Sequence, residues 1–366
     1  MVVLAIATAF VTPLLRRPKT EEGETDNNSN LPSVSIVLAV HDEEEEVERN
    51  LPFFLNQEYN GKFEVIVVDE SSTDNTTEVL KRLKNDFSNL YTTFIPDSSH
   101  YISRRKLALT VGVKAAKNDW IVFTDASCRP SNTKWLTAMA SHATTGTDLI
   151  LGATRYADSA TGYERFERIV RWWREVREAQ CRMAYSYCGC NMMFRRKMFI
   201  EGNGFLNSLK YLRGEYDFLA NEYGERCRTA VANEAEATLT QDAPSRKTWL
   251  NDHLYHIDTR KHLAHGLHHS MLNFFDTLAM HLNIMVQIAA IVVSLLLQLH
   301  VITIAASIAL LLNYLLRVFI GKKAMQAAEE DISIWKIPFL EAFMMWHNLF
   351  LRIRHSRCDK YDFIRR

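Results

Sequence analysis

A long stretch without charged side chains most constrains how this chain can fold. No Asp, Glu, Lys or Arg occurs between Asp276 and Arg317, a run of 40 residues. As a single helix the run would be about 60 Å long, twice the thickness of the hydrocarbon layer of a bilayer. The run therefore predicts a hairpin of two membrane-spanning helices within residues 263–320, with Gln298 and His300 marking the turn.

The N-terminal residues form a second apolar segment. Residues 1–15 are apolar and are followed at once by Arg16, Arg17 and Lys19. A cleaved signal peptide carries its positive charges before the apolar run, so this charge order favours a membrane anchor over residues 1–17. A disordered or interfacial leader is the alternative. Residues 18–32 are polar and rich in turn formers, which predicts a linker.

The positive charges next to these segments predict a topology. Arg317, Lys322 and Lys323 follow the apolar run, and the N-terminal segment also ends in basic residues. Positive residues collect on the cytoplasmic side, so we expect a multi-pass protein of the plasma (inner) membrane with its large domain in the cytoplasm. Within residues 321–366, residues 337–353 form a further apolar stretch. A third membrane span is the alternative, but Glu341 and His347 inside the stretch favour a helix in the cytoplasmic interface.

The charge balance and the cysteines restrict the function further. Basic and acidic residues number 43 each, so the net charge is zero and a nucleic-acid partner is disfavoured. We expect the six cysteines to remain thiols on the reducing side of the membrane.

Residues 33–262 show a regular alternation of two patterns. Runs rich in β-branched residues, typical of strands, alternate with helix-like stretches: strands at 34–40, 63–68, 91–95 and 120–124, and helices at 43–57, 73–86 and 103–116. This order predicts an α/β domain with a mainly parallel sheet and helices on both faces. Ligands bind such sheets beyond the C-terminal ends of the strands.

Acidic residues follow three of the expected strands. Asp42 and Glu43 follow the first strand, Asp69 and Glu70 end the second, and Asp125 follows the later one. Carboxylates at one edge of a sheet repel each other unless a cation or hydrogen-bond donors lie between them. Helix capping accounts for each acid singly but not for their coincidence.

Six segments in order resemble membrane-bound glycosyltransferases of family 2, which have the GT-A fold. No G-x-G-x-x-G follows the first strand and no P-loop motif occurs, which disfavours dinucleotide and P-loop enzymes. The matching segments are VSIVLAVHDEEEEVERNLPFFLNQEY, VIVVDESSTDNT, RRKLALTVGVKAAKNDWIVFTDASCRP, CGCNMMFRRKMF, LRGEYDFLANE and WLNDHLYH. They resemble, respectively, the opening segment, the nucleotide-binding strand, the approach to the D-x-D motif, the acceptor loop, the acidic catalytic motif and the Q-x-x-R-[WH] motif.

The resemblance implies a set of site residues. Asp42, Glu43, Asp69, Glu70, Arg105, Lys106 and Asp125 would bind the nucleotide-sugar donor, with Glu70 at the base, Asp42 or Glu43 supporting it, and Arg105 or Lys106 near the diphosphate. Asp125 would also bind a divalent cation, Mg²⁺ or Mn²⁺. Asp217 or Glu215 would be the catalytic base, and Asn191 and His256 would lie on the acceptor side.

Three of these motifs depart from the family pattern. Ser127 stands at the second D-x-D acid, Tyr216 stands where a base carboxylate is usual, and Asp252 and Tyr255 replace the Gln and Arg of the last motif. The leading hypothesis is inverting transfer of a sugar to a lipid-linked or glycan acceptor in polysaccharide biosynthesis at the cytoplasmic face. The alternative is a catalytically weakened relative that acts as a binding or assembly partner.

Overall fold

The computed structural model describes residues 1–15, 31–96, 103–181, 183–225, 228–359 and 362–363. The chain divides into two compact units, each described here by itself. One unit comprises residues 1–18, 161–177 and 265–354, and we call it the hairpin unit. The other comprises residues 19–160, 178–264 and 355–366, and we call it the sheet unit. Most of the expected linker, residues 18–30, lies outside the described residues.

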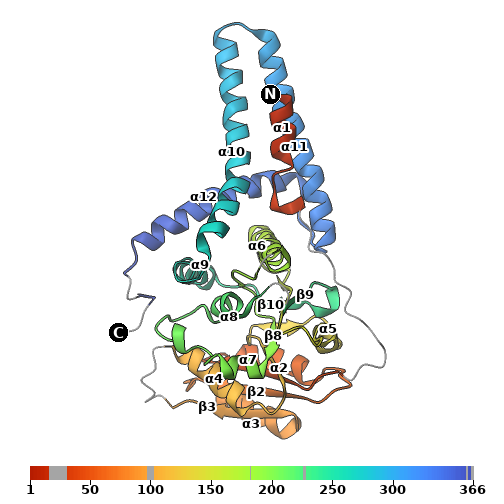
Figure 1. The fold of residues 1–366 in the computed structure, drawn as a ribbon, viewed down its shortest axis with the longest axis vertical. Helices are drawn as coiled ribbons and strands as arrows, with labels where there is room; N and C mark the ends of the chain where they lie inside the picture. The colour runs from red at the N-terminus through yellow and green to blue at the C-terminus, as the bar shows by residue number, and fades with distance from the viewer. Residues whose placement is uncertain (16–30, 97–102, 182, 226–227, 360–361, 364–366) are drawn as a thin grey trace. The chain divides into compact units, whose positions relative to one another are not determined.

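The sheet unit is built around a seven-stranded sheet in the order β3-β2-β1-β4-β8-β6-β9 (Figure 1). Four parallel strands form its first half: β1 (Val34–Val40), β2 (Phe63–Asp69), β3 (Leu90–Phe94) and β4 (Trp120–Phe123). β1 is buried at every position, as expected for the central strand of a parallel sheet that is covered on both faces. The parallel strands predicted from the sequence are therefore confirmed.

Three helices connect these strands: α2 (Glu44–Leu55), α3 (Thr76–Asp86) and α4 (Arg104–Ala115). The chain moves outward from β1 to β3 and then returns past β1 to β4. Since parallel crossovers are right-handed, α2 and α3 cover one face of the sheet and α4 covers the other. The strand order reverses between β1 and β4, which is where such sheets bind ligands.

The second half of the sheet is mixed. β8 (Met192–Arg195) runs antiparallel to both β4 and β6 (Leu149–Gly152), and β9 (Thr229–Ala232) pairs in parallel with β6. A three-stranded sheet forms from β5 (Cys128–Pro130), β10 (Leu239–Gln241) and β7 (Thr154–Tyr156). The remaining helices of this unit are α5 (Trp135–Ser141), α7 (Arg196–Glu201), α8 (Glu215–Tyr223) and α9 (Arg246–Arg260). Helix α6 (Gly162–Cys181) has residues in both units.

The hairpin unit contains the uncharged run. It folds into α10 (Gly266–Leu296) and α11 (His300–Ala327), which lie side by side, with Gln298 in a left-handed conformation at the turn (Figure 1). Among the described residues these two helices are long and apolar enough to cross a membrane, with a mean hydropathy of 2.0 for each apolar stretch. Only 22 % and 28 % of the residues in these stretches are buried, whereas the core helix of a soluble domain is mostly buried. The two helices form a hairpin as predicted, and their insertion in a membrane stays a prediction.

Two further segments accompany the hairpin. The expected anchor is an eight-residue helix, α1 (Val2–Ala9), which is about 12 Å long and lies along α11 (Figure 1). By itself this helix is too short to cross a bilayer. A short turn of helix (Ile334–Lys336) and α12 (Ile337–Ser356) follow α11, so the predicted helix in the C-terminal segment is present.

Candidate active site

The end of β1 is tied to the turn after β2 by Asp42. Asp42 has a left-handed backbone with φ of 53°, and its carboxylate accepts a hydrogen bond of 2.6 Å from the Thr73 amide. This bond lowers the pKa of Asp42. Asp69, at the end of β2, accepts hydrogen bonds from the Ser72 amide and hydroxyl and from the Thr77 hydroxyl, at 2.7–2.8 Å. Both residues shape the strand ends.

Arg105 connects the sheet edge to the acidic motif. It lies in the first turn of α4, and its guanidinium contacts both Asp125, just after β4, and Glu215, the first residue of α8. The contact from Arg105 Nε to Glu215 is 2.5 Å long. The Arg105 and Glu215 side chains are only 13 % and 6 % exposed, so water screens this ion pair weakly. Arg105 thereby joins Asp125 and Glu215, which are 90 positions apart in the sequence, into one site.

Asp125 also has hydrogen-bond partners other than Arg105. The Tyr216 hydroxyl donates a hydrogen bond of 2.8 Å to the same carboxylate oxygen, Oδ1. The Cys190 thiol donates a hydrogen bond to the same side chain. Burial alone would raise the pKa of Asp125, but Arg105 and these hydrogen bonds hold it below its usual value. Asp125 is therefore ionised at neutral pH.

The backbone before α8 directs Glu215 into this cluster. Gly214 caps the helix in a left-handed conformation with φ of 89°, and a side chain there would collide with Thr259. Glu215 Oε1 accepts the hydrogen bond from Arg105, whereas the buried Oε2 has no hydrogen-bond partner among the described residues. A buried carboxylate oxygen without a partner is costly, which points to a ligand at this position.

Asp217 lies in the same first turn of α8 but has different partners. Its Oδ1 accepts from the Tyr187 amide at 3.2 Å, and its Oδ2 lies 3.0 Å from Nδ1 of His256 on α9. Burial would raise the pKa of Asp217, but His256 and the hydrogen bond from Tyr187 lower it. Asp217 and His256 thus form a buried pair.

Two further carboxylates, those of Glu43 and Glu70, interact electrostatically with Arg105. Burial raises the pKa of Glu43 to about 7, against the opposing effect of Arg105. Burial also raises the pKa of Glu70, which is 8 % exposed and interacts with Arg105 and Arg213. Glu43, Glu70 and Asp125, at the ends of β1, β2 and β4, therefore act on a common guanidinium.

Two predicted site residues have other surroundings. Lys106 is fully buried, and its ammonium donates hydrogen bonds to the carbonyls of Ser208 and Tyr211 at 2.8 and 3.0 Å. Of the two cations predicted near the diphosphate, Arg105 forms ion pairs with the acidic cluster, whereas Lys106 acts on Glu215 and Asp217 as a nearby charge. Asn191 is also fully buried and donates to the carbonyls of Ala153 and Ala237, so it is not open to an acceptor.

The donor set for a metal ion is small. Within the described part of the chain, no three His, Cys, Asp or Glu side chains are grouped to hold a metal ion. Asp125 offers a hard carboxylate oxygen of the kind that Mg²⁺ and Mn²⁺ prefer. Asp125 fits a cation that takes one ligand from the protein and its other ligands from a diphosphate and water.

Sequence reasoning missed the roles of Tyr216 and Cys190. Tyr216 was noted only as a departure from the acidic motif, yet its hydroxyl bonds to the residue at the D-x-D position. Cys190 is one of the six cysteines expected to remain thiols, and its contact with Asp125 depends on the fold. No sequence signal connects these residues to Asp125, because the contacts join separate strands and helices.

Comparison with known proteins agrees with this architecture. Residues 35–202 match the family model for glycosyl transferase family 2. The chain carries a family 2 glycosyltransferase domain. The matched region includes Asp42, Glu70, Arg105 and Asp125, whereas Glu215 and Asp217 lie beyond it.

Two curated relatives show local similarity. Glycosyltransferase AglE of Haloferax volcanii is 28 % identical over 143 residues, which cover 38 % of this chain and 45 % of the relative. An uncharacterized glycosyltransferase of Haemophilus influenzae is 27 % identical over 105 residues, 29 % of this chain and 40 % of the relative. The matched regions thus span less than half of either relative.

One solved structure has a similar fold over nearly its whole length. The mannosyltransferase PcManGT from Pyrobaculum calidifontis, in complex with GDP-Man and Mn²⁺, superposes with a TM-score of 0.60 and 15 % identity. The match covers 97 % of this chain and 98 % of that chain. This similarity identifies the fold as GT-A and agrees with the α/β class predicted from the sequence.

Proposed function

We propose that the protein transfers a sugar from a nucleotide-activated donor to an acceptor, by a single displacement that inverts the anomeric centre. The observation that carries this proposal is the bridge from Asp125 through Arg105 to Glu215. It joins the edge of the sheet where donors bind to the helix that carries the candidate bases. Family membership supports the reaction class.

Arg105 would serve the departing diphosphate. Negative charge develops on the leaving group in the transition state, and a fixed cation in a poorly screened site stabilises it. Arg105 is held in place by two carboxylates, so little reorganisation is needed when a donor binds. Asp125 would hold a divalent cation, which when bound would neutralise further charge on the diphosphate.

One carboxylate of the first turn of α8 would deprotonate the acceptor. Glu215 is supported by its buried Oε2, which has no partner among the described residues and is available to a hydroxyl. Asp217 is ionised, because its pKa is lowered, and His256 would orient it or relay a proton. The two residues are two positions apart on a helix and point in different directions, so we expect one of them to act on the acceptor.

The membrane hairpin would bring the enzyme to its acceptor. We propose that α10 and α11 cross the bilayer, with the basic residues after α11 and the catalytic domain on the cytoplasmic side. A lipid-linked or growing-glycan acceptor fits an enzyme held at that surface.

Release of nucleoside diphosphate tests the proposed reaction. The full chain in proteoliposomes should release the diphosphate from at least one member of a panel containing GDP-mannose, UDP-glucose and UDP-GlcNAc, with Mg²⁺, Mn²⁺ or a chelator present. Asp125→Asn should reduce this release strongly, because it removes the ionised partner of Arg105. Binding without release in the presence of candidate acceptors would favour the alternative of a non-catalytic partner, and no binding of any donor would contradict the proposal.

A further inference from the structure

Helix α12 presents an apolar stripe to the outside. Phe339, Phe343, Trp346, Phe350 and Ile353 recur every three or four residues, so they lie on one side of the helix. Their exposed fractions range from 45 % to 66 %. Aromatic side chains form most of the stripe, and soluble surfaces rarely expose such a patch without a binding partner.

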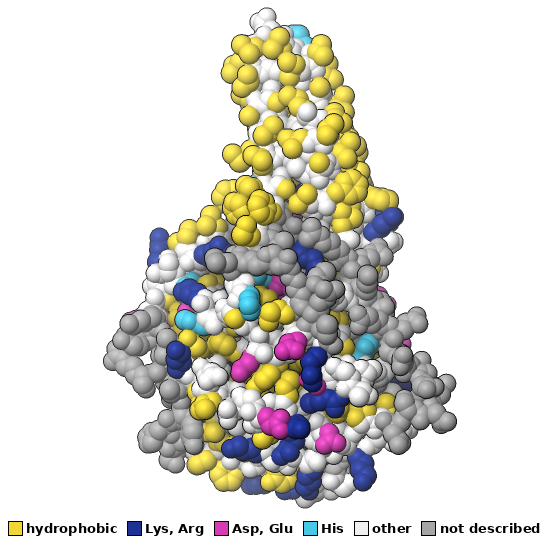
Figure 2. Space-filling view, viewed as in Figure 1, with side chains coloured by type: hydrophobic (Ala, Val, Ile, Leu, Met, Phe, Trp, Pro, Cys, Tyr) yellow, Lys and Arg dark blue, Asp and Glu magenta, His cyan; other side chains and the backbone are white. Residues whose placement is uncertain are grey.

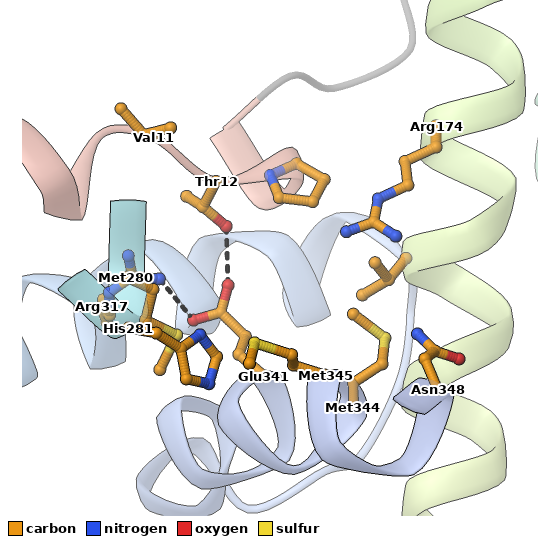
Figure 3. Close-up of a pocket in the computed structure, with 12 residues that line it drawn as sticks. Val11, Thr12, Arg174, Met280, His281, Arg317, Glu341, Met344, Met345 and Asn348 are labelled. Carbon is orange, nitrogen blue, oxygen red and sulfur yellow. Dashed lines mark hydrogen bonds and ion pairs between the residues drawn. The ribbon is translucent and has the colours of Figure 1, made fainter. Parts of the chain in front are cut away.

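The opposite side of α12 is packed within the hairpin unit. Ile337, Met344 and Leu351 are buried on this side. Glu341, the only acidic residue of α12, also points inward: it accepts 2.6 Å from the Thr12 hydroxyl and pairs with Arg317 at 2.9 Å (Figure 3). The exposed stripe is therefore free of acidic residues.

A small cavity lies beside this ion pair. Its volume is about 30 Å³, which is enough for one or two water molecules. It is lined by Val11, Thr12, Pro13, Val170, Arg174, Met280, His281, Arg317, Glu341, Met344, Met345 and Asn348 (Figure 3). The Arg317 and Glu341 side chains beside this cavity are themselves buried, at 3 % and 8 % exposed.

The ion pair of Glu341 with Arg317 sets the depth in the bilayer at which α12 meets the hairpin. Arg317 lies 18 residues from Leu299 at the turn, which is about 27 Å along the helix. The ring of Trp346 lies 6.3 Å from that of His281, and His281 is 16 residues, or about 24 Å, from Leu297. A hydrocarbon layer is about 30 Å thick, so these contacts lie near the edge remote from the turn. α12 crosses the direction of α10 and α11 there (Figure 1).

The composition of α12 suits lipid better than a second protein copy. Hydrophobic side chains cover the α10–α11 hairpin and continue toward α12 (Figure 2). Aromatic rings are enriched at the boundary between acyl chains and headgroups. Lys336, Arg352 and Arg354 are exposed near the ends of the stripe, where anionic headgroups would attract them.

We propose that the exposed stripe of α12 is a membrane-binding surface that lies in the bilayer interface, parallel to the membrane plane. The ion pair of Glu341 with Arg317 fixes the stripe at the depth of the boundary. This inference rests on the proposed insertion of the hairpin, and it adds a second attachment for the enzyme. Such an attachment would hold the hairpin unit at a constant depth in the bilayer.

Quenching of tryptophan fluorescence by brominated phosphatidylcholine tests this surface. The full chain is reconstituted in vesicles that contain phosphatidylglycerol and lipids brominated near the headgroup, and floated protein is measured. Trp346→Phe keeps an apolar ring and should reduce the fluorescence quenched by bromine. Trp135→Phe is the control, because Trp135 is buried in the sheet unit against Phe54 and should not contribute to that quenching.

The possible outcomes show whether lipid, solvent or protein lies against the exposed stripe of α12. Trp346 quenched by brominated lipid and protected from aqueous iodide supports the inference. Floated protein in which iodide quenches Trp346, or in which neither agent does, overturns it in favour of a solvent-exposed or a protein-covered stripe. Protein that fails to float with the vesicles contradicts membrane insertion as well, so the two failures are distinguishable.

Discussion

Replacing Arg105 by methionine should destabilise the sheet unit strongly. Arg105→Met preserves the length of the side chain but leaves Asp125 and Glu215 without their shared cation. Those carboxylates are 19 % and 6 % exposed, so they cannot recover their hydration without local rearrangement. Removing one partner of a buried ion pair costs about 3–5 kcal/mol, and we expect a loss of unfolding free energy in this range.

A surface ion pair provides the matched control for Arg105. Arg49 contacts Asp242 at 2.6 Å, but the Arg49 side chain is 50 % exposed. Solvent screens such a pair, so Arg49→Met should change the unfolding free energy by about 0–1 kcal/mol. Both variants are compared with the parent chain in the same detergent, by thermal unfolding followed by tryptophan fluorescence.

The pH dependence of the Arg105 variant provides a second test. Without Arg105, burial raises the pKa of Asp125 above its value in the unfolded chain. The native variant then binds more protons than the unfolded chain, so its stability should fall as pH rises, and its deficit should be larger at pH 8 than at pH 5. An Arg105→Met deficit no larger than that of Arg49→Met, or one that grows toward acid pH, would refute the proposed charge compensation.

Four other variants test individual side chains. Lys106→Met should lower the unfolding free energy by about 1.5–3 kcal/mol, because two backbone carbonyls lose a charged donor, while the nucleotide affinity of folded protein stays unchanged. The pKa of Glu43 is raised to about 7, so parent stability should fall as pH rises from 4.5 to 7, and Glu43→Gln should flatten that slope in thermal melts. Glu215→Gln and Asp217→Asn should be compared in turnover assays: the variant that removes the base should lose about 10²–10⁴-fold with donor affinity preserved, and normal turnover in both would exclude both residues.

Much of the first half of the domain follows from local sequence patterns. The β-branched run at 34–40 and the alternating helices identify parallel strands, because apolar periodicity reflects burial directly. The acidic strand ends then converge because parallel strands end at one edge. Glu43, Glu70 and Asp125, which all interact with Arg105, could therefore be predicted as neighbours without a structure.

Other parts of the site depend on long-range packing. Nothing local distinguishes Arg105 from Lys106, since they are adjacent in the same helical turn, yet one enters the cluster and the other faces buried carbonyls. The polar character of Asn191 is compatible with an acceptor site, but the fold uses its amide to satisfy two backbone carbonyls. Such choices are set by which faces of separate elements meet.

The central claim is that the acidic strand ends form a nucleotide site, and calorimetric titration of the full chain with UDP and GDP tests it most directly. The account predicts that at least one nucleotide binds, that Glu70→Ala weakens this binding by about 1–3 kcal/mol through a lost hydrogen bond, and that Arg49→Met leaves it unchanged. Absence of binding by both nucleotides, or equal affinity in the parent chain and Glu70→Ala, would contradict the account.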